Sequence, residues 1–123
     1  MSTTKLKVSS LAQQHLDLLS TRLGLRPNII CRLALGRSLS ISESVRHLEP
    51  IDSAGNEFNR HTLTGEFDEI FEILICQHEG RKIGEDMYFP IFFRNHLERG
   101  IDSLYNEYQQ INSPINFLLG LVK

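Results

Sequence analysis

Residues 3–39, TTKLKVSSLAQQHLDLLSTRLGLRPNIICRLALGRSL, carry one strand signal and two helix signals in direct succession. Leu6 and Val8 alternate with Lys5 and Lys7 at the start of this stretch. Successive side chains of a strand point to opposite faces, so this alternation predicts a short strand. One face of the strand would be apolar, and the other would carry two positive charges.

A helix, a glycine turn and a second helix are predicted after the strand. Ser10 and Gln13 fit a capping box, which places the start of the first helix near Leu11. Gly24 ends that helix, and Pro27 suits the first turn of the next one. The second helix includes Ile29, Ile30, Cys31, Leu33, Ala34 and Leu35. Because so little of its surface is polar, we expect it to be buried on several sides.

This order of elements is similar to a ribbon-helix-helix unit, a dimeric DNA-binding module. The resemblance implies that Lys5 and Lys7 project from a two-stranded antiparallel ribbon, formed by two chains, that lies in the DNA major groove. It also implies that the start of the second helix offers N–H groups to a phosphate. Arg26, Pro27 and Asn28 stand there in place of the usual serine or threonine cap. An ordinary edge strand with solvated lysines remains the alternative interpretation.

Charge is distributed unevenly along the chain. Residues 1–47 contain seven basic and two acidic residues, whereas residues 48–123 contain six basic and thirteen acidic ones. The first part therefore carries a net charge of +5 and the second −7, which together give the −2 of the whole chain. A polyanion would be attracted to the first part. With double-stranded DNA as the expected partner, the candidate contact residues are Lys5, Lys7, Arg22, Arg26, Asn28 and Arg37.

The remaining pattern predicts a mainly α fold. A short helix is expected between Ser40 and Leu48, and Gly100 marks a possible bend in a long helix that begins near Pro90. Residues 1–49 are predicted to form a basic ribbon-helix-helix-like DNA-binding unit. Residues 50–63 are predicted to be a loop or linker with a weak extended piece around Phe58. Residues 64–123 are predicted to be an acidic helical half for packing and assembly, which opens with a helix at Thr64. Together they suit one compact domain.

No signature of catalysis occurs in the sequence. The patterns G-x-x-x-x-G-K-[ST], G-x-G-x-x-G, H-E-x-x-H and G-x-S-x-G are all missing. Cys31 lies among apolar residues, and burial raises the pKa of a thiol, so it is a poor nucleophile. We therefore expect a protein that is not an enzyme.

No metal site, cofactor or membrane segment is predicted either. Cys76 and His78 are two residues apart and point in different directions on a helix, and no C-x-x-C or H-x-x-x-H pattern completes a ligand set. No apolar run approaches the roughly 20 residues of a membrane span. The first ten residues, MSTTKLKVSS, lack an apolar signal core, so we expect a cytoplasmic protein.

The full-length pattern resembles the DndE family, the small subunit of the bacterial DNA phosphorothioation system. Three stretches carry the resemblance: Arg26–Leu39, Leu63–Gln77 and Phe92–Leu104. It implies a protein that acts with a cysteine desulfurase, an iron–sulfur sulfurtransferase-like component and an ATPase. Together these proteins replace a non-bridging phosphate oxygen of DNA with sulfur. The resemblance does not imply that this subunit carries the sulfur.

The expected function is that of a non-catalytic subunit that holds duplex DNA, intact or nicked, through phosphate contacts. The apolar second helix and the apolar chain end predict a homo-oligomer, either a dimer or a tetramer. Two alternatives stay open. One is a ribbon-helix-helix transcription repressor that reads an operator, and the other is an assembly subunit that binds only proteins.

Overall fold

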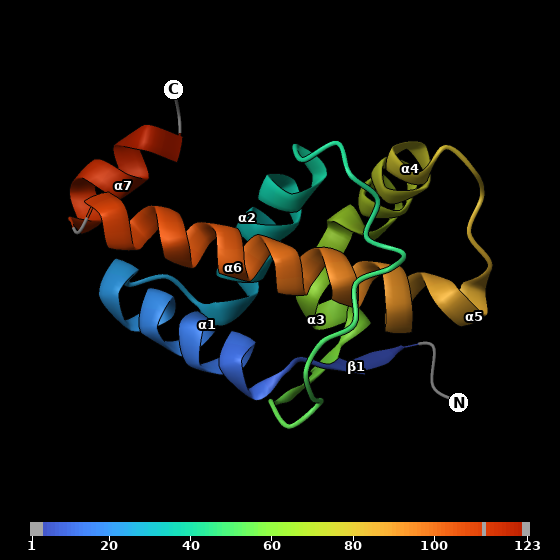
Figure 1. The fold of residues 1–123 in the computed structure, drawn as a ribbon, viewed down its shortest axis with the longest axis horizontal. Helices are drawn as coiled ribbons and strands as arrows, with labels where there is room; N and C mark the ends of the chain where they lie inside the picture. The colour runs from blue at the N-terminus through green and yellow to red at the C-terminus, as the bar shows by residue number, and fades with distance from the viewer. Residues whose placement is uncertain (1–3, 112, 122–123) are drawn as a thin grey trace.

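The computed structural model describes residues 4–111 and 113–121 and shows a mainly α protein with a small two-stranded sheet (Figure 1). This confirms the predicted fold class. The elements are β1 (Lys5–Lys7), α1 (Ser10–Leu23), α2 (Pro27–Leu39), β2 (Glu57–Asn59), α3 (Arg60–Thr64), the 3₁₀ turn η1 (Gly65–Phe67), α4 (Asp68–Glu79), α5 (Glu85–Met87), the π-helical segment η2 (Tyr88–Phe93), α6 (Arg94–Ile111) and α7 (Pro114–Leu121).

The strand and the two helices of the N-terminal stretch form as predicted. Helix α1 is capped by Ser9, one residue before the predicted cap, because the Ser9 hydroxyl accepts a hydrogen bond from the Ala12 N–H at 3.1 Å. Gly24 ends α1 with φ of 69°, the left-handed conformation that glycine adopts without strain. Ser10 instead donates from its N–H and its hydroxyl to Asp52, at 2.8 and 2.9 Å.

β1 forms a two-stranded ribbon with β2 of the same chain, whereas the sequence predicted a ribbon formed by two chains. β1 pairs antiparallel with β2, with Leu6 opposite Phe58. The Gly55 N–H donates to the Val8 carbonyl at 2.8 Å and fixes the return of the chain. β2 supplies only three residues, too few for a clear alternation, so its pairing depends on contacts that are distant in sequence.

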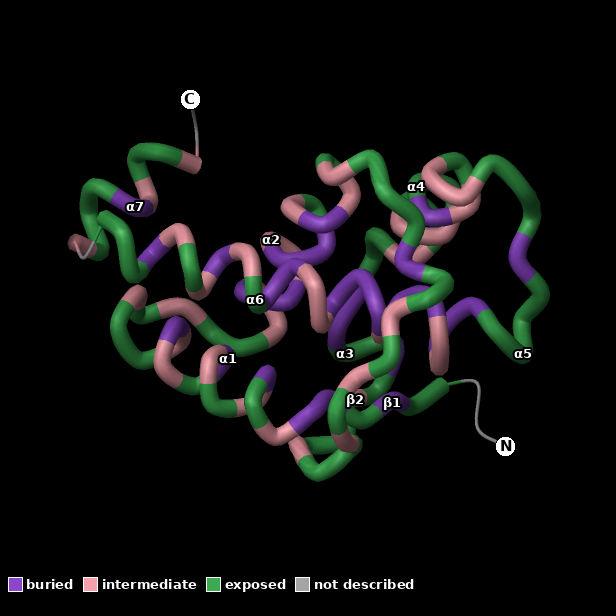
Figure 2. The backbone as a smooth tube through the Cα atoms, viewed as in Figure 1, coloured by how far each residue is buried: buried purple, intermediate pink, exposed green. Residues whose placement is uncertain are grey.

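Helix α2 lies at the centre of the fold and packs mainly against α6 (Figure 2). Ile30, Cys31, Ala34 and Leu35 of α2 are buried by other elements of the same chain, whereas Leu33 and Leu39 are only partly buried. Helix α6 runs without a break through Gly100, where a bend was expected. A Cβ on Gly100 would lie 1.9 Å from the Ala34 carbonyl oxygen, so glycine is needed for the close crossing of the two helices.

Residues 40–49 form turns and irregular backbone, and the short helix predicted there is absent. Side chains of α6 hold this segment instead. The Asn95 amide donates to the carbonyls of Val45 and Leu48 at 2.9 and 3.1 Å. Arg99 donates to the carbonyls of Ser38, Ile41 and Glu43. The backbone acceptors are therefore satisfied without a helix.

The stretch predicted as a loop or linker, residues 50–63, contains β2 and most of α3. Helix α4 begins at Asp68 rather than Thr64, because Gly65, with φ of 56°, separates α3 from the 3₁₀ turn. Arg60 joins these short elements through ion pairs to three carboxylates. They belong to Asp68, Glu72 and Glu85. Residues 57–63 thus belong to regular elements, whereas residues 50–56 have irregular backbone and are mostly exposed.

Candidate nucleic-acid interface

An open basic pocket of about 340 Å³ lies where the sheet meets the start of α6. Its cationic side chains come from Lys5, Lys7 and Arg94. The other lining residues are Leu6, Ser53, Glu57 and Pro90. An anion such as a phosphate would meet positive charge there from two segments that are about ninety residues apart in sequence.

The alternation of β1 sets the direction of its two lysines. Leu6 is buried with 5% of its surface exposed, so Lys5 and Lys7 on either side point to solvent. Lys5 lies 3.7 Å from a carboxylate oxygen of Glu57, with both side chains about half exposed. Such an exposed pair is worth little and leaves the ammonium available. Within residues 4–111 and 113–121, Lys7 takes part in no ion pair.

Arg94 was not among the predicted contact residues. It is the first residue of α6, and the π-helical segment before it brings it beside β1. Its guanidinium contacts the Asn95 side-chain oxygen at 3.2 and 3.4 Å, a neutral partner, so its charge is not cancelled there. No local sequence signal marks Arg94, because its position depends on how the segment after Pro90 packs on the strand.

A second basic group lies at the other end of α1. Arg22 and Arg26 are both exposed there. Arg26 is the N-cap residue of α2 but makes no side-chain capping bond, and Pro27 follows it. Asn28, in the first turn of α2, is half-buried. Pro27 has no N–H, and the N–H groups of Ile29 and Ile30 donate to the Arg26 carbonyl at 3.0 and 3.2 Å, so the Asn28 N–H and the helix dipole are what favour an anion at this end.

The structure does not gather all predicted residues into one patch. Helix α1 has 14 residues and separates Lys7 from Arg22 by roughly 20 Å at 1.5 Å per residue. Arg37 lies at the far end of α2, where its guanidinium is 3.1 Å from a carboxylate oxygen of Glu107. Both side chains are about one third exposed, so the charge of Arg37 is largely compensated within the chain.

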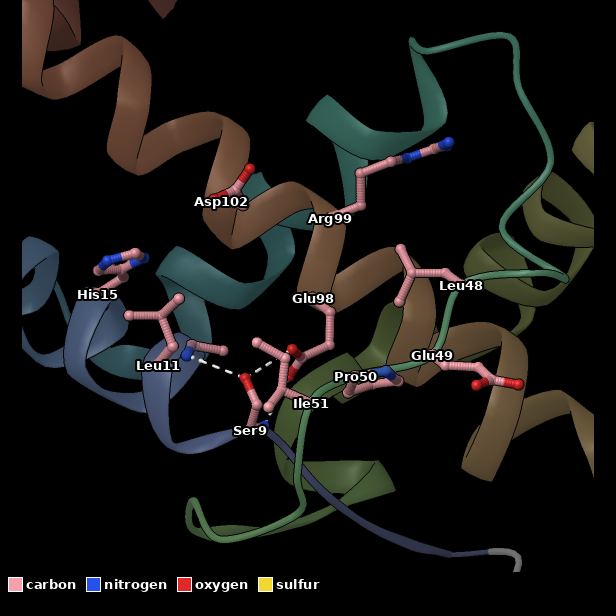
Figure 3. A pocket seen from close by; sticks show the side chains of 11 residues that line it. Ser9, Leu11, His15, Leu48, Glu49, Pro50, Ile51, Glu98, Arg99 and Asp102 are labelled. Carbon is pink, nitrogen blue, oxygen red and sulfur yellow. Dashed lines mark hydrogen bonds between the residues drawn. The ribbon is translucent and has the colours of Figure 1, made fainter.

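A different pocket, of about 250 Å³, lies between the start of α1, residues 48–51 and α6 (Figure 3). Glu98 reaches from α6 to Ser9, whose N–H and hydroxyl both donate to its carboxylate at 2.8 Å. Glu49 and Asp102 also line this pocket. The three carboxylates outnumber Arg99, which also lines the pocket, so the pocket carries a net negative charge that would repel a phosphate.

Two buried titratable side chains, Cys31 and His96, are held in their neutral forms. Burial raises the pKa of the Cys31 thiol to about 12, against a smaller opposing effect of Arg32. Burial also lowers the pKa of His96 to about 3, and the neighbouring His78 and Arg99 act in the same direction. In the described part of the chain, no three histidine, cysteine or acidic residues lie together as metal ligands. No helix in that part is long and apolar enough to span a membrane.

The fold and the pocket describe a small helical protein whose candidate nucleic-acid surface has two exposed lysines and one half-buried arginine. The family model of the DNA sulphur modification protein DndE matches residues 5–112, and the chain therefore belongs to the DndE family. This confirms the family expected from the sequence and its connection with DNA phosphorothioation.

Solved structures show the same fold. The crystal structure of DndE from Escherichia coli B7A, involved in DNA phosphorothioation modification, is similar with a TM-score of 0.69 and 22% identity; the match covers 85% of this chain and 98% of that one. The crystal structure of a DndE mutant involved in DNA phosphorothioation is similar with a TM-score of 0.63 and 22% identity, over 84% and 97% of the two chains. A search of curated proteins found no match.

Proposed function

We propose that this protein is a non-catalytic, DNA-binding subunit of the phosphorothioation machinery. In this proposal it acts in the cytoplasm as a homo-oligomer with other proteins of the system, and it holds duplex DNA, intact or nicked, through phosphate contacts. The observation that supports the proposal most directly is the open pocket lined by Lys5, Lys7 and Arg94. These cations come from separate elements, and the carboxylates of the described chain leave most of their charge uncompensated.

The spacing of the two basic groups supports contacts along a DNA backbone. Duplex DNA carries one negative charge per roughly 1.7 Å of axis, so a span of about 20 Å passes about twelve phosphates. The pocket and the arginines at the α1–α2 turn could therefore meet different phosphates of one duplex. Contacts to phosphates do not depend on which bases are present, so binding should be largely independent of the DNA sequence.

Salt-dependent gel shifts test the proposal. Lys7→Ala and Arg94→Ala should each weaken binding of a nicked and an intact duplex, because each removes a cation from the pocket. Each change should also reduce the slope of log Kd against log salt by about 0.9. Lys82→Ala is the matched control, since Lys82 is an exposed cation that does not line this pocket.

The same experiment separates the alternatives. An equal loss of binding for Lys82→Ala and Lys7→Ala would attribute binding to net charge and contradict a site at the pocket. A strong preference for one operator over random DNA would favour a sequence-reading repressor. The pairing of β1 with β2 gives that alternative no support, because the ribbon is completed within one chain. Failure to bind any duplex at low salt would point to an assembly subunit.

A further inference from the structure

Gly36 is an exposed glycine in the interior of α2 that its own chain does not require. Glycine destabilises a helix interior relative to alanine, so a glycine there normally serves a close approach. Gly100 has such a reason, since a Cβ would meet the Ala34 carbonyl oxygen at 1.9 Å. A Cβ on Gly36 would meet no atom of the described residues within 4 Å. Among the described residues none makes a close approach to Gly36, so the position is open to a neighbouring molecule.

Two pockets meet at Gly36 and together form what we call the α2 groove. The pocket towards α7 has a volume of about 270 Å³, and the pocket towards α4 about 350 Å³. The residues that line them, besides Gly36, are Arg32, Leu33, Arg37, Ser40 and Leu121 on the first side and Leu39, Leu74, Gln77 and His78 on the second. Helices α7 and α4 lie on either side of α2 in Figure 1.

The two arginines of the α2 groove are held by contacts within the chain, although only Arg37 has an anionic partner. Arg32 donates from Nε to the Leu63 carbonyl at 2.8 Å, and Arg37 pairs with Glu107 at 3.1 Å. A cationic occupant would find no carboxylate among the lining residues and would lose its hydration, and most of the other lining side chains are apolar. The groove therefore fits an uncharged, apolar occupant.

Helix α7 of the same sequence presents such an occupant. Ile115 and Leu119 are 71% and 54% exposed, and they lie four residues apart on one face of the helix. We call this pair the α7 ridge. Residues Pro114–Leu121 contain no charged side chain. The two ridge side chains are separated by roughly 6 Å along the helix axis, which suits two neighbouring pockets.

We propose that the α7 ridge of a second copy docks in the α2 groove, with Ile115 and Leu119 on either side of Gly36. This inference rests on the self-association in the proposed function and names its interface. Leu121 of α7 lines the α2 groove of its own chain, so groove and ridge lie close together on each copy. In a two-fold dimer, the ridge of each copy would therefore dock in the groove of the other. β1 lies across α6 from α7 in Figure 1, which leaves the basic pocket free.

Sedimentation velocity of the full chain at micromolar concentration tests the interface. Gly36→Leu fills the groove, and Leu119→Asp puts a charge on the ridge. Each should raise the dissociation constant of the dimer at least tenfold. Ile51→Asp is the matched control, because Ile51 is 88% exposed but lies outside groove and ridge, and it should leave the constant unchanged. Circular dichroism verifies folding, which Gly36→Leu should preserve because the position is open and helical.

Mixing the two variants gives an independent test. Gly36→Leu retains a ridge and Leu119→Asp retains a groove, so the mixture should associate more strongly than either variant alone. A monomeric wild type would overturn both the proposed self-association and this interface. A wild-type oligomer that survives in either variant would overturn the interface alone. DNA binding by Lys7→Ala tests the basic pocket, and its result does not affect the test of this interface.

Discussion

Gly100 shows how a single residue fixes the packing of the two central helices. A Cβ there would lie 1.9, 2.4 and 2.9 Å from the carbonyl oxygen, carbonyl carbon and Cα of Ala34. These are backbone atoms of a buried helix, so they cannot move aside as the end of a flexible side chain can. The whole α2–α6 contact would have to widen.

Gly100→Ala should therefore lower the free energy of unfolding by about 3 kcal/mol, at the upper end for overpacking, despite the better helix propensity of alanine. Urea denaturation measures the change. Gln110→Ala, at an exposed position of the same helix, should stay within about 0.5 kcal/mol of wild type. A stabilised Gly100→Ala protein would show that the helices do not cross this closely.

His96 is the buried residue with the largest expected effect on pH dependence. Its ring is fully buried, its Nδ1 lies 2.8 Å from the Ser38 hydroxyl, and its ring centre is 4.9 Å from that of His78. Burial first, and then the charges of His78 and Arg99, lower the pKa of His96 from 6.5 to about 3. In the unfolded chain His96 therefore binds a proton near pH 6.5, whereas in the folded chain it stays neutral at that pH.

The sign of this linkage predicts a loss of stability in acid. Above pH 6.5 the proton is bound in neither state and His96 contributes no pH dependence. Below it, the free energy of unfolding should fall by about 1.4 kcal/mol per pH unit, giving about 2 kcal/mol at pH 5. In His96→Gln this component should vanish, so its stability between pH 7 and pH 5 should change less than that of wild type. Identical pH profiles would contradict the prediction.

Short elements of the second half are held together by Arg60. Its guanidinium forms a two-point contact with Asp68 at 2.8 and 2.9 Å, and it lies 4.8 Å from the ring centre of Tyr88. Glu72 and Glu85 complete the cluster at 3.1 and 3.3 Å. One buried cation thereby links α3, α4, α5 and the π-helical segment, none of which is long enough to be stable alone.

Arg60→Met should cost about 3 kcal/mol of unfolding free energy, because it leaves Asp68 partly buried without its cation. Arg60→Lys should cost less but should not be neutral, since an ammonium cannot make the two-point contact. Chemical denaturation measures both changes. Arg46→Met, at an exposed position, is the control. A loss below about 1 kcal/mol for Arg60→Met would show that Arg60 does not organise these elements.

At the scale of the whole molecule, charge and apolar surface lie in different places. The basic pocket is at the sheet, the acidic pocket lies between α1 and α6, and the α2 groove is beside α4 and α7. This arrangement would let the protein bind DNA and a second copy at the same time. DNA binding should thus survive Leu119→Asp at high protein concentration, with the loss of affinity limited to the part that depends on two copies.

The sequence by itself determined the elements whose signals are local. Alternation at Leu6 specified β1, the serines and Gly24 bounded α1 within one residue, and the stretch from Arg26 to Leu39 indicated the family. Periodicity and capping act between near neighbours, so they can be read without a fold. The unequal charge of the two parts was equally visible.

Only the tertiary structure decided which distant residues meet. β2 pairs with β1, where the sequence predicted a strand of a second chain. Arg94 lines the basic pocket together with Lys7, whereas Arg37 forms an ion pair with Glu107. Side chains of Asn95 and Arg99 replace a predicted helix in residues 40–49. Each of these outcomes depends on hydrogen bonds or ion pairs between segments far apart in sequence, and their energies exceed the weak local preferences of short segments.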